Sequence, residues 1–265
     1  MTYELYYWPM IQGRGEFVRL ALEDCGAAYV DVARQSNKRG GMKALLRLLD
    51  GKGIACPPFA PPVLKAGRLV IGQTANILLF LGAHHRLAPQ GEAGRLWVHQ
   101  LQLTLADFLQ EIHDTHHPIA GGLYYEDQRA AARRRAADFR AARAPKFLAY
   151  FEDVLRRNGK TGPYLLGARR SYADLSLFQI VAGLRYAFPN AMARLDGRHP
   201  RIAALHDTVA ARPRIAAYLA SDRRIPFNQQ GIFRHYTALD AKRSAAKILR
   251  TSRRSSAREG RSPLG

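Results

Sequence analysis

The chain has 265 residues, of which 47% are hydrophobic and 23% are charged. This composition excludes an intrinsically disordered chain, and the length corresponds to about two domains at roughly 150 residues each. The formal net charge of +20 would suit nucleic acid or an anionic membrane surface as a partner.

The first third of the chain predicts alternating strands and helices. Residues 2–8 are rich in aromatic side chains and predict a strand, whereas residues 16–24 carry apolar side chains at helical spacing. Two short apolar runs around Gly67 predict a β-hairpin. The expected order is strand, helix, strand, helix, hairpin and helix, at residues 2–8, 16–24, 28–32, 42–49, 63–71 and 74–81. We therefore expect residues 1–84 to form a compact α+β domain.

The chain from residue 92 to residue 240 predicts helices only. Apolar side chains recur at helical spacing in five spans, 92–115, 126–157, 173–186, 198–211 and 213–221. We therefore predict an all-α domain over residues 92–240, after a junction at 84–92 that contains a proline and a glycine. Residues 241–265 hold eight basic residues, one acidic residue and no aromatic residue. They predict a basic, disordered tail.

The end of the first predicted strand is the first candidate site. Tyr7 stands there, just ahead of the turn that leads into the first helix. A tyrosine hydroxyl that faces a helix N-terminus can donate a hydrogen bond to an anion such as a thiolate. The alternative is that Tyr3, Tyr6 and Tyr7 are ordinary aromatic residues of a strand.

The hairpin and the helix after it hold two further candidates. A cis peptide bond before Pro62 would turn the Val63 backbone outward, where it could pair with a peptide-like ligand. An ordinary proline-rich loop is the alternative. Gln73 and Thr74 stand at the start of the next helix, where the Thr74 hydroxyl and free backbone N–H groups could bind a carboxylate. Thr74 could equally be a plain N-cap, and the two roles are compatible.

Two motifs in the helical domain could be structural or functional. Ser171 and Asp174 have the spacing of a capping box, which predicts the start of a buried helix. His113 and His117 lie four residues apart on one helical face, with His116 beside them. This cluster could be a metal site, a polar patch that faces a cleft, or a structural cluster. Because a catalytic zinc needs three fixed protein ligands, we expect no metal here.

The cysteine content limits the redox chemistry of the chain. Cys25 and Cys56 are too few for a disulfide framework, and they fit a reducing compartment. Neither follows the first strand or forms a Cys-x-x-Cys motif, so thiol–disulfide exchange lacks its nucleophile. The N-terminus has no signal-peptide pattern, and no apolar run approaches about 18 residues. We therefore expect a cytoplasmic protein without a transmembrane helix.

Three segments in this order resemble the cytosolic glutathione transferases. They are LYYWP with GRGEFVRLALEDCGAAY, then PPVLKAGRLVIGQTANILLFL, then GPYLLGARRSYADLSLF. The resemblance spans about residues 3–221 and implies a thioredoxin-like domain, an all-α domain and a homodimer. It is greatest to the tyrosine-type classes, and the extension 222–240 suggests a bacterial-style subgroup. That extension holds enough Phe and Tyr to pack back onto the body.

The resemblance also implies how glutathione would be bound. Pro62 matches the cis-proline, and Val63 matches the residue whose backbone pairs with the cysteinyl part of glutathione. Gln73 and Thr74 match the pair that holds the γ-glutamyl carboxylate. Arg14 resembles the arginine that supports the first loop and the glutathione site.

The resemblance further implies the reaction. Tyr7 would donate a hydrogen bond from its hydroxyl to the glutathione thiolate, which then attacks a small apolar electrophile without a metal ion. Tyr6 would point to the opposite face of the strand. The fourth helix would line the electrophile pocket, at Phe108, Ile112, His113 and His116.

A different class of function stays open at this point. The same scaffold could be a non-catalytic binding or interaction protein, because a fold does not establish an activity. In that case the basic tail could contact nucleic acid or an anionic surface, with binding that weakens steeply as salt rises. We expect the enzyme, with glutathione and an electrophile as partners and no nucleic acid.

Overall fold

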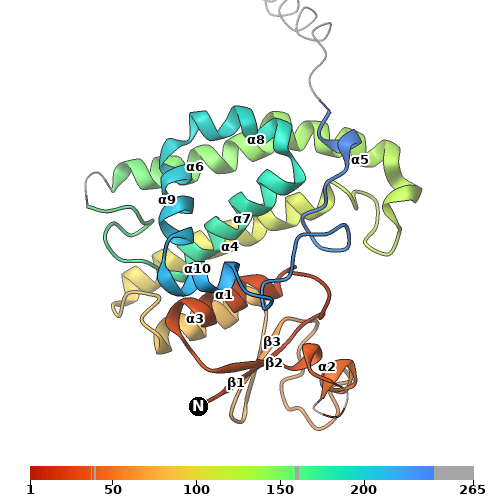
Figure 1. Ribbon diagram of the computed structural model, residues 1–265, viewed down its shortest axis with the longest axis vertical. Coiled ribbons are helices and arrows are strands. Elements are labelled where there is room, and N and C mark those ends of the chain that lie inside the picture. Colours follow the sequence, from red (N-terminus) through yellow and green to blue (C-terminus); the bar gives the residue numbers. More distant parts are fainter. Residues whose placement is uncertain (37, 39, 159–160, 242–265) are drawn as a thin grey trace, which may run out of the picture.

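The first domain is built on a four-stranded sheet with the strand order β2-β1-β3-β4. The computed structural model describes residues 1–36, 38, 40–158 and 161–241 (Figure 1). Strand β1 (Tyr3–Tyr6) pairs in parallel with β2 (Tyr29–Asp31) and antiparallel with β3 (Val63–Ala66). Strand β4 (Leu69–Gly72) pairs antiparallel with β3.

Three helices cover the two faces of this sheet. Helices α1 (Gly15–Cys25) and α3 (Thr74–His84) share one hydrophobic core with Leu5 and Leu64 of the strands. Helix α2 (Gly41–Leu49) packs on the opposite face, against the neighbouring strand residues Tyr6 and Val63. The alternation follows from the two-residue period of a strand. The predicted βαβαββα order is confirmed.

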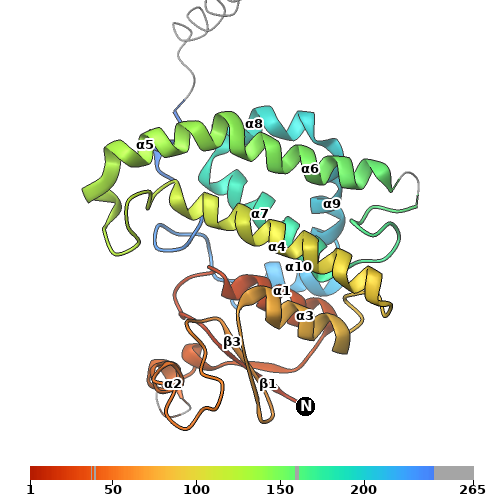
Figure 2. The ribbon, with the colours of Figure 1, turned by 180° about the vertical axis from the view of Figure 1, so that it is seen from behind.

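The second domain contains helices only, within the described part of the chain. Figures 1 and 2 show these helices stacked above α1 and α3, on the side away from the sheet. Helix α7 is their buried centre and contacts α1, α4, α8 and α9. The helices are α4 (Glu92–Asp114), α5 (Arg129–Asp138), α6 (Ala144–Arg157), α7 (Tyr172–Ala187), α8 (Pro189–Leu195), α9 (Pro200–Ala210) and α10 (Pro213–Leu219).

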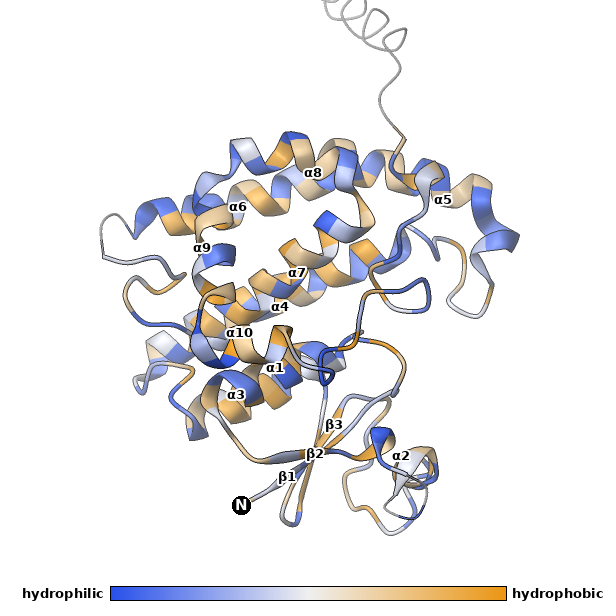
Figure 3. Ribbon diagram, in the orientation of Figure 1, coloured by the Kyte–Doolittle hydropathy of each residue, from blue (hydrophilic) through white to orange (hydrophobic). Residues whose placement is uncertain are grey.

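Two details of the helical domain differ from the sequence expectation. The span 126–157 is not one helix, because a 3₁₀ turn precedes α5 and a π-helical turn (Phe139–Arg143) separates it from α6. Figure 3 shows that the beginning of α5 is hydrophilic. Its buried side chains are the small ones of Ala132 and Ala136. Helix α8 was not expected, because its seven residues lie between the predicted spans 173–186 and 198–211.

The predicted capping box at the start of α7 is confirmed. The Asp174 carboxylate accepts hydrogen bonds from the backbone N–H and the hydroxyl of Ser171, at 2.6 and 2.7 Å. It also accepts one from the backbone N–H of Leu165, at 2.7 Å. One buried carboxylate therefore fixes both the helix start and the loop before it.

Residues 222–240, which we call the strap, run from α10 back across the helical domain. As expected, their aromatic residues pack onto the body: Phe233 lies against Gly183, and Tyr236 stacks on Tyr125 with ring centroids 3.8 Å apart. Asp240 accepts hydrogen bonds from the N–H groups of Asn190 and Ala191 at the start of α8. The strap is thus fixed along its length, and the predicted tail after it lies outside the described residues.

The architecture is therefore an α+β thioredoxin-like domain followed by an all-α domain. Among the described helices, none combines the length and the apolar composition that crossing a bilayer requires.

Candidate functional site

The ends of three strands meet at one edge of the sheet. Tyr6 at the end of β1 lies opposite Val63 at the start of β3, and Val63 lies opposite Gly72 at the end of β4. The residues that follow or precede these ends, Tyr7, Pro62 and Gln73, must therefore lie at the same edge. The register thus places the predicted site residues of the first domain beside one another.

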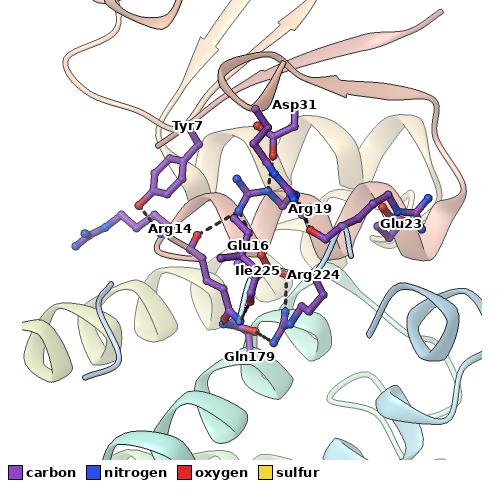
Figure 4. Close-up of polar contacts among 12 residues, drawn as sticks. Tyr7, Arg14, Glu16, Arg19, Glu23, Asp31, Gln179, Arg224 and Ile225 are labelled. Carbon is purple, nitrogen blue, oxygen red and sulfur yellow. Dashed lines mark hydrogen bonds and ion pairs between the residues drawn. The ribbon is translucent and has the colours of Figure 1, made fainter. Parts of the chain in front are cut away.

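Tyr7 packs against the beginning of α1. Its hydroxyl oxygen accepts a hydrogen bond from the backbone N–H of Arg14, the residue before the helix, at 2.8 Å (Figure 4). The two glycines of the Gly13-Arg14-Gly15 turn make this approach possible. A Cβ atom would lie 2.0 Å from the Tyr7 hydroxyl oxygen at Gly13 and 2.5 Å from the ring at Gly15. Any side chain at either position would displace the ring.

The electrostatic surroundings keep the Tyr7 hydroxyl protonated at neutral pH. Burial raises the pKa of this phenol above its usual value, while Arg14, Arg19 and the backbone N–H groups of Arg14 and Gly15 oppose the shift. The oxygen accepts from the backbone, so the hydroxyl proton stays available to a further acceptor. Such a group stabilises an adjacent anion as a hydrogen-bond donor rather than as a base.

Tyr6 is engaged elsewhere. Its hydroxyl donates to Glu4 at 2.6 Å, and Glu4 also pairs with Lys65 at 3.3 Å. Its ring belongs to the core cluster beneath α2, on the other face of the sheet from α1. The geometry therefore favours Tyr7 over Tyr6 as the tyrosine next to the helix N-terminus.

The peptide bond between Pro61 and Pro62 is cis, but Val63 does not present a free backbone. Val63 lies between Tyr6 of β1 and Gly72 of β4, so its N–H and C=O groups face a neighbouring strand. Its side chain is fully buried. The prediction that Val63 pairs with a ligand is therefore corrected. Since Pro61 and Pro62 have no N–H, a peptide-like ligand can use only carbonyl groups at this end of β3.

Arg14, Gln73 and Thr74 line one pocket of about 360 Å³ between the two domains. Gln73 is the N-cap residue of α3 and has a φ of 68°, a left-handed conformation that is uncommon outside glycine. Thr74 is not the N-cap, and its buried hydroxyl oxygen has no hydrogen-bond partner among the described residues. The plain-cap interpretation of Thr74 is therefore wrong, and its hydroxyl is available to a ligand.

Two residues of α4 in the same pocket were missed by the sequence analysis. His99 and Gln102 also line it, and His99 Nδ1 and Gln102 Oε1 are buried without a partner in the described part of the chain. Together with Thr74, three residues of one pocket thus carry unpaired buried polar atoms. Such atoms are costly unless a ligand or water satisfies them. The sequence could have indicated them, because His99 and Gln102 are polar residues three positions apart that interrupt the apolar stripe of Val98, Leu101 and Leu105.

Phe108 and Ile112 are buried in the core of the helical domain, contrary to the prediction that they line the electrophile pocket. Phe108 is fully buried and stacks on Phe147, with ring centroids 4.4 Å apart, and Ile112 is 1% exposed in the same core. Both face the interior of the helical domain because the apolar stripe of α4 packs against α7. The resemblance implied that α4 lines the pocket, but the two apolar residues chosen on it belong to its buried stripe.

The three histidines after this stripe have different roles. His116 is 1% exposed and donates through Nε2 to the carbonyl of Ile232 in the strap, at 2.8 Å, and burial lowers its pKa to about 3. It is therefore a neutral structural residue, and its assignment to the electrophile pocket is corrected. The His113 side chain is 26% exposed and lies 3.2 Å from Asp114. His117 contacts Gln128 at 3.2 Å.

A buried polar network holds the loop between β1 and α1 from behind (Figure 4). The Gln12 side-chain amide donates to the carbonyl of Ile225 in the strap. Its oxygen accepts from the side-chain amide of Gln179 of α7, at 2.7 Å. Arg224 of the strap bonds both Gln179 and Glu16. The strap and α7 therefore fix the turn that carries the Tyr7 contact.

Arg19 anchors α1 to the sheet. Its fully buried guanidinium pairs with Asp31 of β2 at 2.7 Å and with Glu16 at 3.2 Å. The guanidinium carbon also lies 5.8 Å from the centre of the Tyr7 ring. The beginning of α1, and with it the donor that contacts Tyr7, is thus held by ion pairs on both sides.

Comparison with protein families gives a match in the second domain. The family model described as "Glutathione S-transferase, C-terminal domain" matches residues 113–222. Among curated proteins, the glutathione S-transferase of Plasmodium falciparum (isolate 3D7) is 22% identical over 82% of this chain and 94% of its own length. Glutathione S-transferase P of Caenorhabditis elegans is 28% identical over 87% of this chain and 99% of its own.

Solved structures agree on the fold. A Pi-class glutathione S-transferase of Onchocerca volvulus superposes with a TM-score of 0.67 at 21% identity, covering 87% of this chain and 99% of that protein. Prostaglandin synthase D of Nilaparvata lugens gives a TM-score of 0.64 at 21% identity, with coverage of 85% and 100%. At these identities the superpositions establish the fold alone.

Proposed function

We propose that the chain is a glutathione S-transferase, as the match of residues 113–222 to the C-terminal domain model of that family indicates. It binds glutathione at the edge where β1 and β4 end and β3 begins, and it activates the thiol for attack on a small apolar electrophile. The observation that carries the proposal is the pocket lined by Arg14 and Thr74, which holds three unpaired buried polar atoms: the Thr74 hydroxyl oxygen, His99 Nδ1 and Gln102 Oε1. The Arg14 guanidinium and the Thr74 hydroxyl can donate to a carboxylate, and Gln102 Oε1 can accept from an N–H group of the same ligand. We expect the enzyme to be a cytoplasmic homodimer, as the relatives' family generally is.

Binding uses charge and unsatisfied donors. The γ-glutamyl carboxylate would accept from the Thr74 hydroxyl and from the free N–H groups at the start of α3. Arg14 already donates to Gln110 of α4 at 2.7 Å, so its guanidinium is held at the pocket wall while it contributes positive charge. The cysteinyl N–H would find only a carbonyl acceptor at Pro61 or Pro62.

Catalysis needs a thiolate at neutral pH. A free thiol with a pKa of about 8.5 is only a few per cent ionised at pH 7. The Tyr7 hydroxyl would donate its proton in a hydrogen bond to the sulfur, next to the positive end of α1. Lowering the thiol pKa by ~2 units corresponds to about 2.7 kcal/mol of stabilisation of the anion. The thiolate then forms the new carbon–sulfur bond, and the electrophile releases its leaving group or takes up a proton.

The electrophile would lie against the exposed apolar residues of the β1–α1 loop. Trp8 and Met10 are 37% and 69% exposed there. Asn228 of the strap donates to the carbonyl of Met10 at 2.9 Å, and Ile11 lies beside Gly231. The His113 side chain on α4 is partly exposed, and we retain it in the proposed electrophile site.

The direct test of the proposal is retention on immobilised glutathione, followed by turnover of a chloronitrobenzene electrophile. Retention with elution by free glutathione, and a rate that saturates with both substrates, is the expected result. Retention without turnover of any of several electrophile classes would instead identify a non-catalytic glutathione-binding protein. The proposal would be refuted if the protein showed no retention and no turnover.

Replacing Thr74 with Val should raise the KM for glutathione by about tenfold or more. The change removes a hydrogen bond to a charged group, a loss of about 1.5–3 kcal/mol, and it preserves the shape of the side chain. Steady-state kinetics with glutathione varied would measure the effect. Thr104→Val on the exposed face of α4 is the matched control, since Thr104 only bonds the carbonyl of Gln100 in its own helix. Equal KM values for the two variants would remove Thr74 from the site.

Replacing His113 with Ala should change the KM for the electrophile by about threefold or more, as expected for one lost polar contact. The KM for glutathione should change less, because His113 does not line the pocket of Arg14 and Thr74. The exposed His84 of α3 provides the control variant, His84→Ala. Stoichiometric zinc in the purified protein, with activity lost to a chelator and restored by zinc, would overturn the metal-free site.

A further inference from the structure

A second pocket, of about 760 Å³, opens at the junction between α3 and α4 and shares no lining residue with the proposed glutathione site. Four arginines line it, Arg86, Arg169, Arg170 and Arg212. They come from the α3–α4 linker, the loop before α7 and the end of α9. Figures 1 and 2 show that the linker and this loop lie at the same end of the helical layer. No acidic residue is among those that line the pocket.

Two of these arginines are fixed by a carboxylate beneath them. Asp24 has a fully buried side chain and accepts from Nε of Arg170, at 2.7 Å, and from Nε of Arg212. Arg212 also donates through Nη1 to the Tyr164 hydroxyl, at 3.4 Å. Because Asp24 uses only the Nε groups, most terminal Nη donors of both guanidiniums remain for another acceptor. One carboxylate thus orders two cations and neutralises only one of them.

The other two arginines add uncompensated charge. Neither Arg86 nor Arg169 makes an ion pair within the described part of the chain, and both are exposed. Arg86 has a φ of 56°, at a position after α3 where glycine is usually found. A non-glycine residue in this conformation costs about 1 kcal/mol. A charge that the Arg86 side chain contributes to the pocket would offset this cost.

We propose that this pocket binds a small polyanion that carries two or more phosphate groups. Guanidinium groups match phosphate oxygens in geometry, and several of them around one concavity suit a multiply charged anion better than a single carboxylate. Gly91, the N-cap of the 23-residue helix α4, also lines the pocket, and no side chain caps that helix start. The pocket volume accommodates an organic group beside the phosphates, against Pro89, Tyr164 and Leu166.

Titration calorimetry of the full chain with inorganic pyrophosphate at low ionic strength tests this proposal. We expect saturable binding of one pyrophosphate per chain. The double variant Arg86→Gln, Arg169→Gln should weaken it at least tenfold, since two unpaired cations are lost at exposed positions where folding is unaffected. The control is Arg133→Gln, Arg134→Gln on α5, which removes the same charge at exposed positions elsewhere. It should retain the affinity of the unmodified chain.

Two outcomes would overturn the proposal. Equal weakening by both double variants, or heats that do not saturate, would mean that pyrophosphate only senses the net charge of the protein. Tighter binding of a single-stranded oligonucleotide that neither double variant weakens would point to nucleic acid and to another surface. All variants keep the basic tail, so their differences report on the pocket alone. Chloronitrobenzene turnover should be the same in both double variants as in the unmodified chain. A chain without turnover would contradict the proposed glutathione site, not the polyanion pocket.

Discussion

Replacing Tyr7 with Phe should lower turnover by at least tenfold while the KM for glutathione stays nearly unchanged. The hydroxyl is lost but the ring still fills the space over Gly13 and Gly15. The backbone N–H of Arg14 loses its acceptor, which should cost about 1 kcal/mol of folding stability at most. Steady-state kinetics and thermal unfolding of the variant and the unmodified chain would measure both effects.

The pH dependence distinguishes a lost proton donor from a distorted site. If Tyr7 stabilises the thiolate, the ascending limb of kcat/KM should move up by ~2 pH units in the variant, towards the free-thiol pKa of about 8.5. Tyr6→Phe is the matched control, because it removes the same atom on the other face of the sheet, where the hydroxyl bonds Glu4. Loss of turnover in the Tyr6 variant alone would show that the catalytic hydroxyl is misassigned.

Replacing Asp174 with Ala should destabilise the fold by about 3 kcal/mol, more than the 1–2 kcal/mol of a helix cap alone. Beyond the two Ser171 donors of the capping box, the carboxylate also accepts from Leu165. Three buried donors therefore lose their acceptor together. Chemical denaturation would measure the loss. At temperatures where the variant is folded, both KM values should be unchanged, and a selective fall in turnover would contradict a structural role.

The same carboxylate predicts a pH dependence of stability. Burial raises the pKa of Asp174 to about 6 from its ordinary value of 3.8. Because the folded pKa lies above the unfolded one, the linked stabilisation is present below about pH 4 and is lost as the pH rises through 6. Relative to Asp174→Asn, the unmodified chain should lose up to about 3 kcal/mol across this interval. A constant difference from pH 4 to pH 7 would contradict the raised pKa.

The elements of the fold could be predicted from the sequence where a period or a turn residue marks them. The aromatic-rich run of β1, the hairpin around Gly67 and the capping box of Asp174 are such signals, and all three elements are present. Helix α8 was not predicted, because its seven residues lie between two spans assigned to longer helices. The division of 126–157 into α5, a π-helical turn and α6 could not be seen in a span that reads as continuous helix.

The site could be predicted only where a motif fixes the backbone. Tyr7, Gln73 and Thr74 follow or adjoin strand ends, so their neighbourhood depends on the register, which the apolar pattern determines. Residues on α4 had no such constraint. The family resemblance implied Phe108 as a ligand contact, whereas the tertiary packing of α4 on α7 buries it and leaves Gln102 at the pocket.

The strap gives the β1–α1 loop a second anchor, more than 200 residues away in the sequence. Contacts of Gln12 with Ile225 and of Met10 with Asn228 hold the loop at two points. A loop restrained in this way loses its conformational entropy when the protein folds, not when substrate arrives. Substrate affinity should then depend on strap side chains that never touch a substrate. If a substitution frees the strap, the loop becomes ordered only when substrate binds, and the lost entropy weakens binding.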